Sequence, residues 1–416
     1  MLGRSLLRNL DRCDHLVSQY HMINGRRVSL RILPSLMVLS SMIILVALMG
    51  FSVSGSDSYE KELLIREITV LNTLRIGIIN THEGIHTSLI TILDTVGTHI
   101  LESVPLNGMT HGVKKNEANN WWRNNRHICE GKYDGLIVAD TASLARPLLQ
   151  NHCAKPIVIL ITNRYDYAEE DDREYHALME ESCLRPNVLC VATNRLEALY
   201  AARVRRTYLW IQAILPLGAF LPEALSDILG EAEIEIKADD KSWLVHPSGP
   251  LYDLYLKPEL DKLGITLKPI IPGRFGGPLA IHNHTVVHVP HQPTTISFWE
   301  NLASGVDYVV PDIQLYRSWM TSFFGMDGQV FTEEDMSRVM DWYRPEHREF
   351  ICYFSSVDQL REDSTFAVEC LSGRDERQKK IQEFMNQHRR STTKRWTEIL
   401  TWMKTNHFPS PEKETL

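Results

Sequence analysis

The sequence has no CxxC pair and no excess of positive charge. Its seven cysteines therefore lack the paired spacing of a zinc ribbon or a thioredoxin-type site. The formal net charge is −8 over 416 residues, whereas affinity for a nucleic-acid backbone comes mainly from clustered Lys and Arg. Composition thus argues against a nucleic-acid partner. With 44% hydrophobic and 23% charged residues, the chain is expected to be globular, and its length favours two domains.

Charged residues are also absent from Ile32 to Ser56, and the run from Leu36 to Val53 is almost wholly apolar. A helix of eighteen such residues rises roughly 27 Å, about the hydrocarbon thickness of a bilayer. Six arginines precede the run and acidic residues follow it. The positive-inside rule then predicts an N-terminus in the cytoplasm and the bulk of the chain outside it.

This pattern predicts three N-terminal segments: a cytoplasmic tail (1–35), a transmembrane signal anchor (36–55) and a stem (56–73). A cleaved signal peptide, with processing near Val53 and Gly55, is the alternative interpretation. Six cysteines follow the apolar run. An oxidising lumen would allow them to form one to three disulfides, whose pairing the sequence leaves open.

Strands and helices alternate after the stem. Continuous apolar runs, typical of strands in a parallel sheet covered on both faces, predict strands at 74–80, 133–141, 155–167, 187–193 and 208–218. Helices are expected between them, at 85–101, 117–130, 142–151, 169–182 and 194–203. The alternation predicts a Rossmann-like domain over 74–220. The dinucleotide fingerprint GxGxxG is missing after its first strand.

A second α/β pattern begins after a connecting stretch at 219–240. We expect it to form a second Rossmann-like domain over 241–372, followed by a C-terminal helix and tail over 373–416. The expected fold class is therefore α/β, with two Rossmann-like domains facing a cleft. No internal repeat with a period of 20 to 50 residues is visible in the sequence.

Within the second pattern, the stretch from His288 to Asp312 reads as strand end, polar turn, helix and strand, which is one βαβ step. Ligands bind such sheets beyond the carboxyl ends of the strands. Glu300 lies on the predicted helix, whose N-terminal N–H groups and dipole favour a phosphate. The stretch is thus a candidate ligand site.

The segment SFWENLASGVDYVVPD (297–312) resembles the nucleotide-binding segment of GT-B glycosyltransferases, whose helix reads Glu-Ala-Met-Ala-x-Gly-x-Pro-Val-Val. Glu300 and Gly305 occupy the places of its glutamate and glycine. The segment departs from the family at Gln292, where an acidic residue often lies, and at Asp307, which replaces the proline. PGRFGGP, VVHVPHQPTTIS and KPIVILITNRYDY are similar to pieces of exostosin-like and putative eukaryotic and viral glycosyltransferases.

This resemblance implies a type II membrane glycosyltransferase of the Golgi or endoplasmic reticulum, with its catalytic part in the lumen. It would transfer a sugar from a nucleotide-sugar donor, a co-substrate, to a glycan or glycoprotein acceptor, with no cofactor and no metal ion bound by the protein. Two alternatives remain. One is a non-catalytic, membrane-anchored glycan-binding or scaffold protein of the same fold, and the other is a soluble α/β enzyme such as a periplasmic-type binding protein or an epimerase.

By position in the resemblance, Glu300 would accept hydrogen bonds from the ribose hydroxyls of the donor, whereas a solvent-facing helical glutamate is the alternative. Further candidates for donor binding carry hydroxyl, imidazole or guanidinium groups that suit a diphosphate. They are Thr294, Thr295, Ser297, His291 and Arg274. The glycine loop around Arg274 is otherwise a flexible turn, and His291 is otherwise a structural histidine.

In the first predicted domain, His82 and Glu83 follow the first strand, where many GT-B enzymes carry the general base of an inverting transfer. Capping of the next helix is the alternative role for His82. Arg164, Tyr165 and Asp166 are expected to point toward the cleft, unless they form an ordinary strand-end loop.

Two further patterns are weaker. Asn283 begins an N-glycosylation sequon, but its closeness to the proposed donor site argues against a glycan there. The acidic runs at 169–172 and 239–240 are expected to be solvated and not to bind a metal ion.

Overall fold

The computed structural model describes residues 73–98, 100–106, 109, 112–162, 165, 171–220, 243–247, 249–270, 281, 284–292, 295–324 and 332–405. The predicted cytoplasmic tail and anchor lie outside these ranges, as does the stem apart from its last residue. Across the described ranges, no helix is both long and apolar enough to cross a membrane.

Two parallel sheets organise the described residues, consistent with two Rossmann-like domains. The first sheet has six strands in the order β2-β1-β3-β4-β5-β6. Their bounds are β1 Arg75–Ile79, β2 Ile100–Ser103, β3 Gly135–Asp140, β4 Ile157–Ile161, β5 Val188–Ala192 and β6 Ile211–Ile214. Every residue of β3, β4 and β5 is buried, as the predicted apolar runs require for a sheet covered on both faces.

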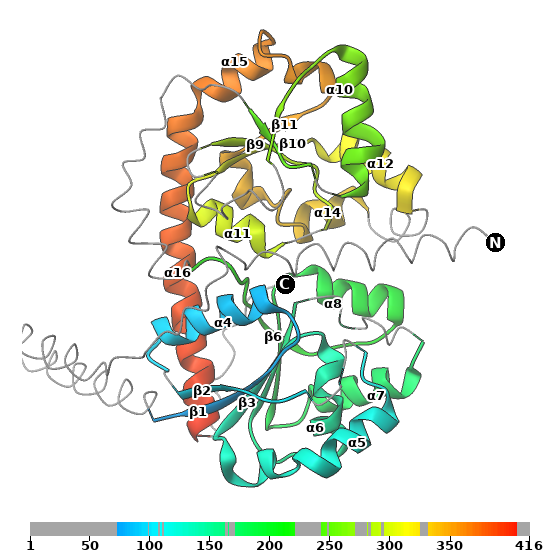
Figure 1. Ribbon diagram of the computed structural model, residues 1–416, viewed down its shortest axis with the longest axis vertical. Coiled ribbons are helices and arrows are strands. Elements are labelled where there is room, and N and C mark those ends of the chain that lie inside the picture. The colour runs from blue at the N-terminus through cyan, green and yellow to red at the C-terminus, as the bar shows by residue number, and fades with distance from the viewer. Residues whose placement is uncertain are drawn as a thin grey trace, which may run out of the picture. The chain divides into compact units, whose positions relative to one another are not determined.

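The helices of this first half, residues 73–220, cover the two faces of the sheet (Figure 1). They are α4 Glu83–Thr95, α5 Lys115–Asn125, α6 Arg146–Gln150, α7 Arg173–Ser182 and α8 Leu196–Tyr200, with short helical turns at Ile128–Lys132, Ala142–Ala145 and Ala201–Arg205. The core splits by strand register: Ile137 and Ala139 face α4, whereas Leu136 and Val138 face α5 and α6. This alternation follows from the period of two along a strand.

The second half, residues 243–372, holds the five-stranded sheet in the order β11-β10-β9-β7-β8, again parallel throughout. Its strands are β7 Leu244–Val245, β8 Lys268–Pro269, β9 Thr285–Val287, β10 Asp307–Pro311 and β11 Ile351–Phe354. Its helices are α10 Lys257–Leu263, α11 Ile296–Ala303, α12 Ile313–Phe324, α14 Glu333–Val339 and α15 Thr365–Ser372, with helical turns at Tyr252–Leu256, Pro345–Phe350 and Val357–Leu360.

The C-terminal helix α16, Arg374–Thr405, belongs to both halves (Figure 1). Near its start, Arg377 Nε donates to Asp307 Oδ2 on β10 at 3.1 Å. Near its end, Trp396 and Leu400 are fully buried in the core between the first sheet and α4. The helix was predicted as a separate C-terminal segment, and its apolar face completes the core of the first half.

Most predicted strands are present, and two short edge strands were missed. β2 was placed in the tail of a helix, which instead ends before Gly97, a glycine with φ +88°. β11 was not predicted at all. Edge strands cover little apolar area, so they lack the long apolar run that marks the central strands. In β2, for example, Ile100 is 39% exposed.

Six of the seven cysteines form disulfides, namely Cys129–Cys153, Cys183–Cys190 and Cys352–Cys370. This is the upper end of the predicted one to three. The seventh, Cys13, lies outside the described residues.

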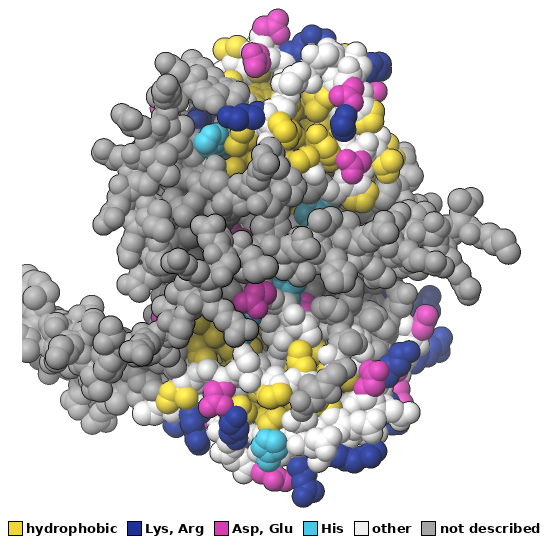
Figure 2. All heavy atoms as spheres, in the orientation of Figure 1, with side chains coloured by type: hydrophobic (Ala, Val, Ile, Leu, Met, Phe, Trp, Pro, Cys, Tyr) yellow, Lys and Arg dark blue, Asp and Glu magenta, His cyan; other side chains and the backbone are white. Residues whose placement is uncertain are grey.

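On the face drawn in Figure 2, Lys and Arg side chains are interspersed with Asp and Glu.

Candidate functional site

Each sheet has a point where the strand order reverses direction, and ligands of open α/β sheets bind at the carboxyl ends of the strands there. In the first sheet this point lies between β1 and β3, so the loops that begin at Asn80 and Thr141 border it. In the second sheet it lies between β7 and β9, bordered by the loops that begin at His246 and His288. Of the predicted site residues, His82 and Glu83 follow β1, and His291 follows β9.

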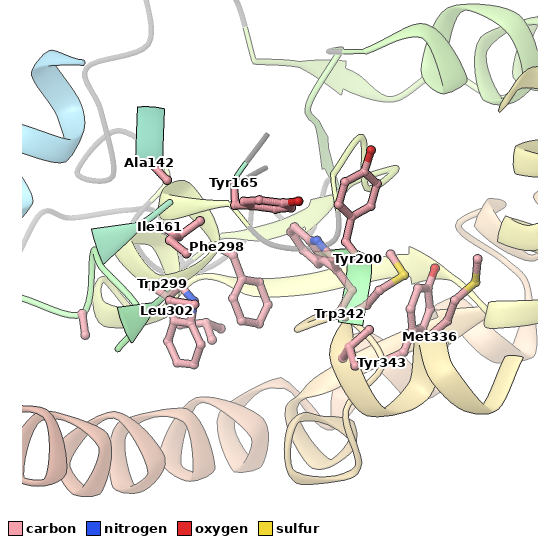
Figure 3. Close-up of a cluster of buried hydrophobic side chains, with 14 of the residues drawn as sticks. Ala142, Ile161, Tyr165, Tyr200, Phe298, Trp299, Leu302, Met336, Trp342 and Tyr343 are labelled. Carbon is pink, nitrogen blue, oxygen red and sulfur yellow. The ribbon is translucent and has the colours of Figure 1, made fainter. Parts of the chain in front are cut away.

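Helix α11 places Glu300 beyond the switch point of the second sheet. Its N-cap is Thr295, whose Oγ1 accepts from Phe298 N at 3.2 Å. The apolar face of α11 is fixed in the core, where the rings of Phe298 and Trp342 pack with centroids 4.6 Å apart (Figure 3). Trp299 Nε1 donates to Asp341 Oδ2 at 3.1 Å. These contacts hold the helix, and therefore the direction of Glu300, in one orientation.

Glu300 is partly buried and finds no hydrogen-bond partner for its carboxylate among the described residues. Desolvation raises the pKa of this carboxyl from 4.5 to about 7. A carboxylate without a protein partner in a partly buried place suits a ligand that brings its own donors, such as a pair of hydroxyls. A raised pKa combined with such a position is typical of functional sites.

Three histidines gather at the switch point of the second sheet. His246 follows β7, and His288 and His291 follow β9. The ring centroids of His246 and His288 are 5.4 Å apart, and those of His288 and His291 are 6.0 Å apart. Burial lowers the pKa of all three imidazoles, that of His291 to about 4. The sequence indicated that either His288 or His291, which flank the same turn, could contact a phosphate, and His291 was chosen as the site residue; His246 was not predicted.

The remaining candidates for donor binding are only partly described. Ser297 is exposed, and its Oγ donates to Thr295 Oγ1 at 3.1 Å, so both hydroxyls lie at the N-terminus of α11. Thr294, Arg274 and the sequon residue Asn283 lie outside the described residues.

In the first half, His82 caps α4. Its Nδ1 accepts from Ile85 N at 3.3 Å, so the neutral ring carries its proton on Nε2 and presents a donor in this conformation. The capping role that the sequence left as the alternative is therefore the one the geometry displays. Glu83 lies in the first turn of α4 with its side chain exposed to solvent.

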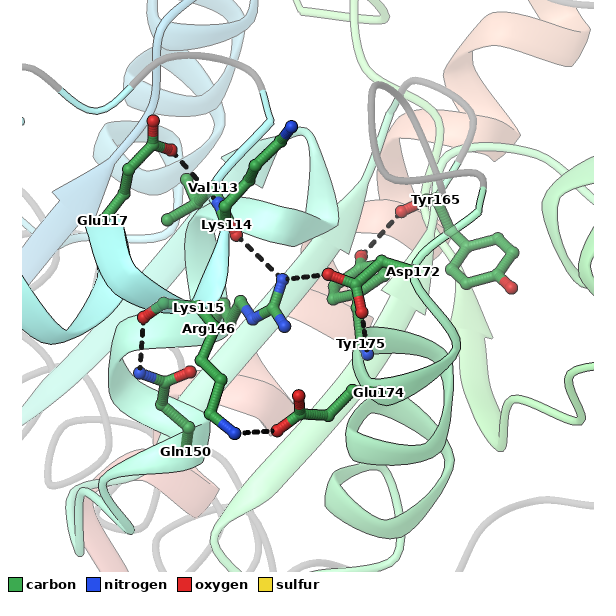
Figure 4. Close-up of polar contacts among 10 residues, drawn as sticks. All are labelled: Val113, Lys114, Lys115, Glu117, Arg146, Gln150, Tyr165, Asp172, Glu174 and Tyr175. Carbon is green, nitrogen blue, oxygen red and sulfur yellow. Dashed lines mark hydrogen bonds and ion pairs between the residues drawn. The ribbon is translucent and has the colours of Figure 1, made fainter.

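Tyr165 was predicted to point toward the cleft, but its side chain lies in the core. It is 0% exposed, and its hydroxyl pairs with His176 Nδ1 at 2.6 Å. Its carbonyl accepts from Tyr175 Oη at 2.7 Å (Figure 4). An aromatic ring after a buried strand gains more from core packing than from solvent, which explains the error. Arg164 and Asp166 lie outside the described residues.

The acidic run at 169–172 was expected to open a helix, and its last residue does so. Asp172 Oδ1 accepts from Tyr175 N at 3.0 Å and so caps α7. Its other oxygen accepts from Arg146, whose side chain is 1% exposed, at 2.7 Å (Figure 4). This carboxylate therefore has a structural partner. The residues at 239–240 and the start of the run lie outside the described part of the chain.

One residue at the switch point of the first sheet was missed. Asp140 ends β3 with φ +80°, a left-handed backbone that side chains other than glycine rarely adopt. It is fully buried, and its carboxylate accepts from the hydroxyl of Thr81, so it ties the loop after β1 to β3. The only sequence signal was an acidic residue at the carboxyl end of a buried strand.

Among the described residues, no group of three or more His, Cys, Asp or Glu is arranged to hold a metal ion. Two surface hollows of about 370 and 240 Å³ lie away from both switch points. The first is bordered by Asp134 and Lys404, and the second by Leu184 and Trp210.

Comparison with known proteins yields no assignment. No family model matches the chain. No curated protein matches it either.

Proposed function

We propose that this protein is a GT-B glycosyltransferase that transfers a sugar from a nucleotide-sugar donor to a hydroxyl of a glycan or glycoprotein. One observation carries the proposal: Glu300 lies beyond the switch point of the second sheet, partly buried, on a helix fixed by its apolar face. This is where a parallel sheet binds a nucleotide. Two parallel sheets in one chain also match the two-domain architecture that the resemblance implies.

In this proposal Glu300 binds the ribose. Its two carboxylate oxygens accept from the two hydroxyls of the cis-diol, and such charge-assisted bonds are short and strong. Donation to the carboxylate stabilises its ionised form, so donor binding would lower the pKa of Glu300 from about 7.

The diphosphate of the donor would lie at the N-terminus of α11. Backbone N–H groups and the helix dipole favour an anion there. The hydroxyls of Thr295 and Ser297 are already at that end of the helix, and His291 precedes them on the same turn. Thr294 and Arg274 complete the proposed set.

The first half would supply the acceptor site and the general base, with the two halves facing a cleft. Glu83 suits the base better than His82, because the Nδ1 of His82 is engaged in capping whereas the Glu83 carboxylate is exposed in the same loop. The proton of the acceptor hydroxyl would pass to Glu83 as that oxygen bonds to the sugar, and the nucleoside diphosphate would leave with the electron pair of the broken bond.

We place the protein in the Golgi or endoplasmic reticulum as a single-pass type II membrane protein, held by residues 36–55. The three disulfides support a lumenal location, since such bonds persist mainly in oxidising compartments.

The test is a screen of nucleotide sugars for stabilisation of the purified full-length chain against thermal unfolding. A donor at about a hundred times its dissociation constant should add about 2.7 kcal/mol to the free energy of unfolding. Glu300→Ala should abolish most of this gain, whereas Glu362→Ala, at an exposed position, should keep it. If no donor stabilises the wild-type protein, the proposal fails and a non-catalytic scaffold becomes the better account.

A further inference from the structure

The histidines at the second switch point hold two buried nitrogen atoms without hydrogen bonds. Nε2 of His288 and Nδ1 of His291 are both inaccessible to solvent, and neither has a hydrogen-bond partner in the part of the chain that the structure describes. His288 is only 5% exposed, and its ring stacks on Trp342 with centroids 4.7 Å apart. A buried polar atom left unpaired costs about 1–3 kcal/mol, so proteins keep few of them.

Aromatic rings pack against His288. In addition to the other two imidazoles, the indole of Trp342 and the ring of Tyr308 pack against His288. The hydroxyl of Tyr308 accepts from Asn301. In the part of the chain that the structure describes, no carboxylate, Lys or Arg shifts the pKa of His288 or His291, and burial and the neighbouring imidazoles lower it. His288 and His291 are therefore uncharged near neutral pH.

We infer that His246, His288 and His291 form a proton-coupled site for a diphosphate group, which binds against His291 as the cluster takes up one proton from solvent. The inference rests on the proposed function for the nature of the anion. It goes beyond that function by assigning His246 and His288 to the site and by making donor affinity depend on the pH of the compartment.

The physical reason is a reversal of the charge balance. Without a ligand, burial favours the neutral rings. An anion at the turn after β9 favours an imidazolium, because an opposite charge nearby raises the pKa of the ring. Gly249, with φ +90°, lets His291 approach: an added Cβ there would lie 2.8 Å from His291 Cβ. The glycine after β7 thus brings the two loops together.

The sign of the pH dependence follows from linkage. A group whose pKa is higher in the complex than in the free protein takes up protons on binding, so affinity rises as pH falls through the pKa of the complex. Each proton taken up corresponds to a gain of up to about tenfold per pH unit. A slightly acidic lumen would then strengthen donor binding.

The test uses P1,P2-dimethyl diphosphate, a diester whose charge is constant near neutral pH and which has no ribose to engage Glu300. Calorimetric titration of the full-length chain in two buffers of different ionisation enthalpy counts the protons taken up. We expect roughly one proton near pH 6.5 and an affinity about three- to tenfold higher per pH unit on acidification.

Two substitutions each replace one unpaired imidazole nitrogen by a polar group that cannot become charged. His288→Gln and His291→Asn should each reduce the proton uptake and flatten the pH dependence, whereas His127→Gln, at an exposed position in the first half, should change neither. Thermal melting at about pH 7.5 checks that each variant is folded.

The inference is overturned if the wild-type protein does not bind the diester, or binds it without proton uptake. It is also overturned if proton uptake survives in both folded variants. The proposed function has a separate criterion. If nucleotide sugars stabilise the protein but the diester shows no coupled proton, only the histidine site fails. If the diester binds with a proton and no nucleotide sugar binds, the function fails and the anion site stands.

Discussion

Gly218 packs directly against the stem of Glu300. A Cβ added to this glycine would lie 3.1 Å from Glu300 Cγ and 2.6 Å from the carbonyl oxygen of Ile296. Gly218 follows the last strand of the first sheet, and the carbonyl oxygen of the next residue, Ala219, accepts from Arg389 Nε of α16 at 2.8 Å. The end of the first half therefore buttresses the proposed ribose-binding residue of the second.

Gly218→Ala should disturb both stability and donor binding. Gly218 has φ +91°, where alanine is strained, and the added methyl group also meets backbone. We expect a loss of about 2–4 kcal/mol in the free energy of unfolding, together with weaker nucleotide-sugar affinity, because α11 must move. Gly264→Ala is the matched control, since φ is +65° there but nothing lies within 4 Å of the added Cβ. Equal losses in the two variants would show that the contact with α11 is unimportant.

Glu300→Gln should stabilise the protein at alkaline pH. The folded protein holds the Glu300 proton with a pKa of about 7, above the ordinary 4.5, so between these values it binds more protons than the unfolded chain. The stability contributed by this carboxyl is thus present at low pH and lost as pH rises through about 7.

Urea denaturation measures this effect. Between about pH 5 and pH 8, the wild-type protein should lose roughly 1–2 kcal/mol relative to Glu300→Gln, less than the full shift implies because the side chain is partly exposed. Glu362→Gln should follow the wild type at every pH. Parallel curves for the wild type and Glu300→Gln would mean that Glu300 ionises freely in the folded protein.

The two acid–base candidates of the first half are separable. His82→Asn should keep the cap of α4, because asparagine is among the best N-cap residues, and transfer activity should change less than about tenfold. Glu83→Gln should lower kcat by about 10²- to 10⁴-fold with little effect on the KM for the donor. Steady-state kinetics with the donor found in the screen decides between them, and the opposite ranking would return the base to His82.

Among the described residues, Arg377 is the charged residue that donates hydrogen bonds to the Asp307 carboxylate. Asp307 is fully buried, and its Oδ1 has no partner. Arg377→Met should cost about 3–5 kcal/mol in a denaturant titration, because it leaves a buried carboxylate without its guanidinium. Lys380→Met, which removes an exposed pair with Glu349, should cost less than about 1 kcal/mol. Similar costs for the two would show that the Arg377–Asp307 pair contributes no more to stability than an exposed ion pair.

The sequence predicted what apolar patterning controls. The buried strands β1, β3, β4 and β5 and the step from β9 to β10 lie where their apolar runs indicate, since covered parallel strands must be apolar throughout. The sequence did not predict contacts between residues far apart along the chain. The docking of Trp396 into the first core and the disulfide pairing depend on how distant segments fold together.

The residues of the candidate site were likewise predicted only in part. Glu300 was found because its neighbours along the chain resemble a family segment. Asp307 stands where the family has a proline, and its pair with Arg377 gives this replacement a structural explanation. The pair lies at the first residue of β10, far from the edge of the sheet at which ligands bind. Asp140 and His246 were missed, because a polar residue at the end of an apolar strand gives no local sign of where its side chain lies.

The most direct test of the account is a double comparison of ligand and protein. Equilibrium binding would be measured for a nucleoside diphosphate and its 2′,3′-dideoxy analogue, on the wild-type protein and on Glu300→Gln. If Glu300 binds the ribose diol, the wild type should prefer the ribonucleotide by about 10- to 100-fold, and the variant should lose most of that preference. Equal affinities of the wild-type protein for the two nucleotides would contradict the assignment of Glu300 as the ribose-binding residue.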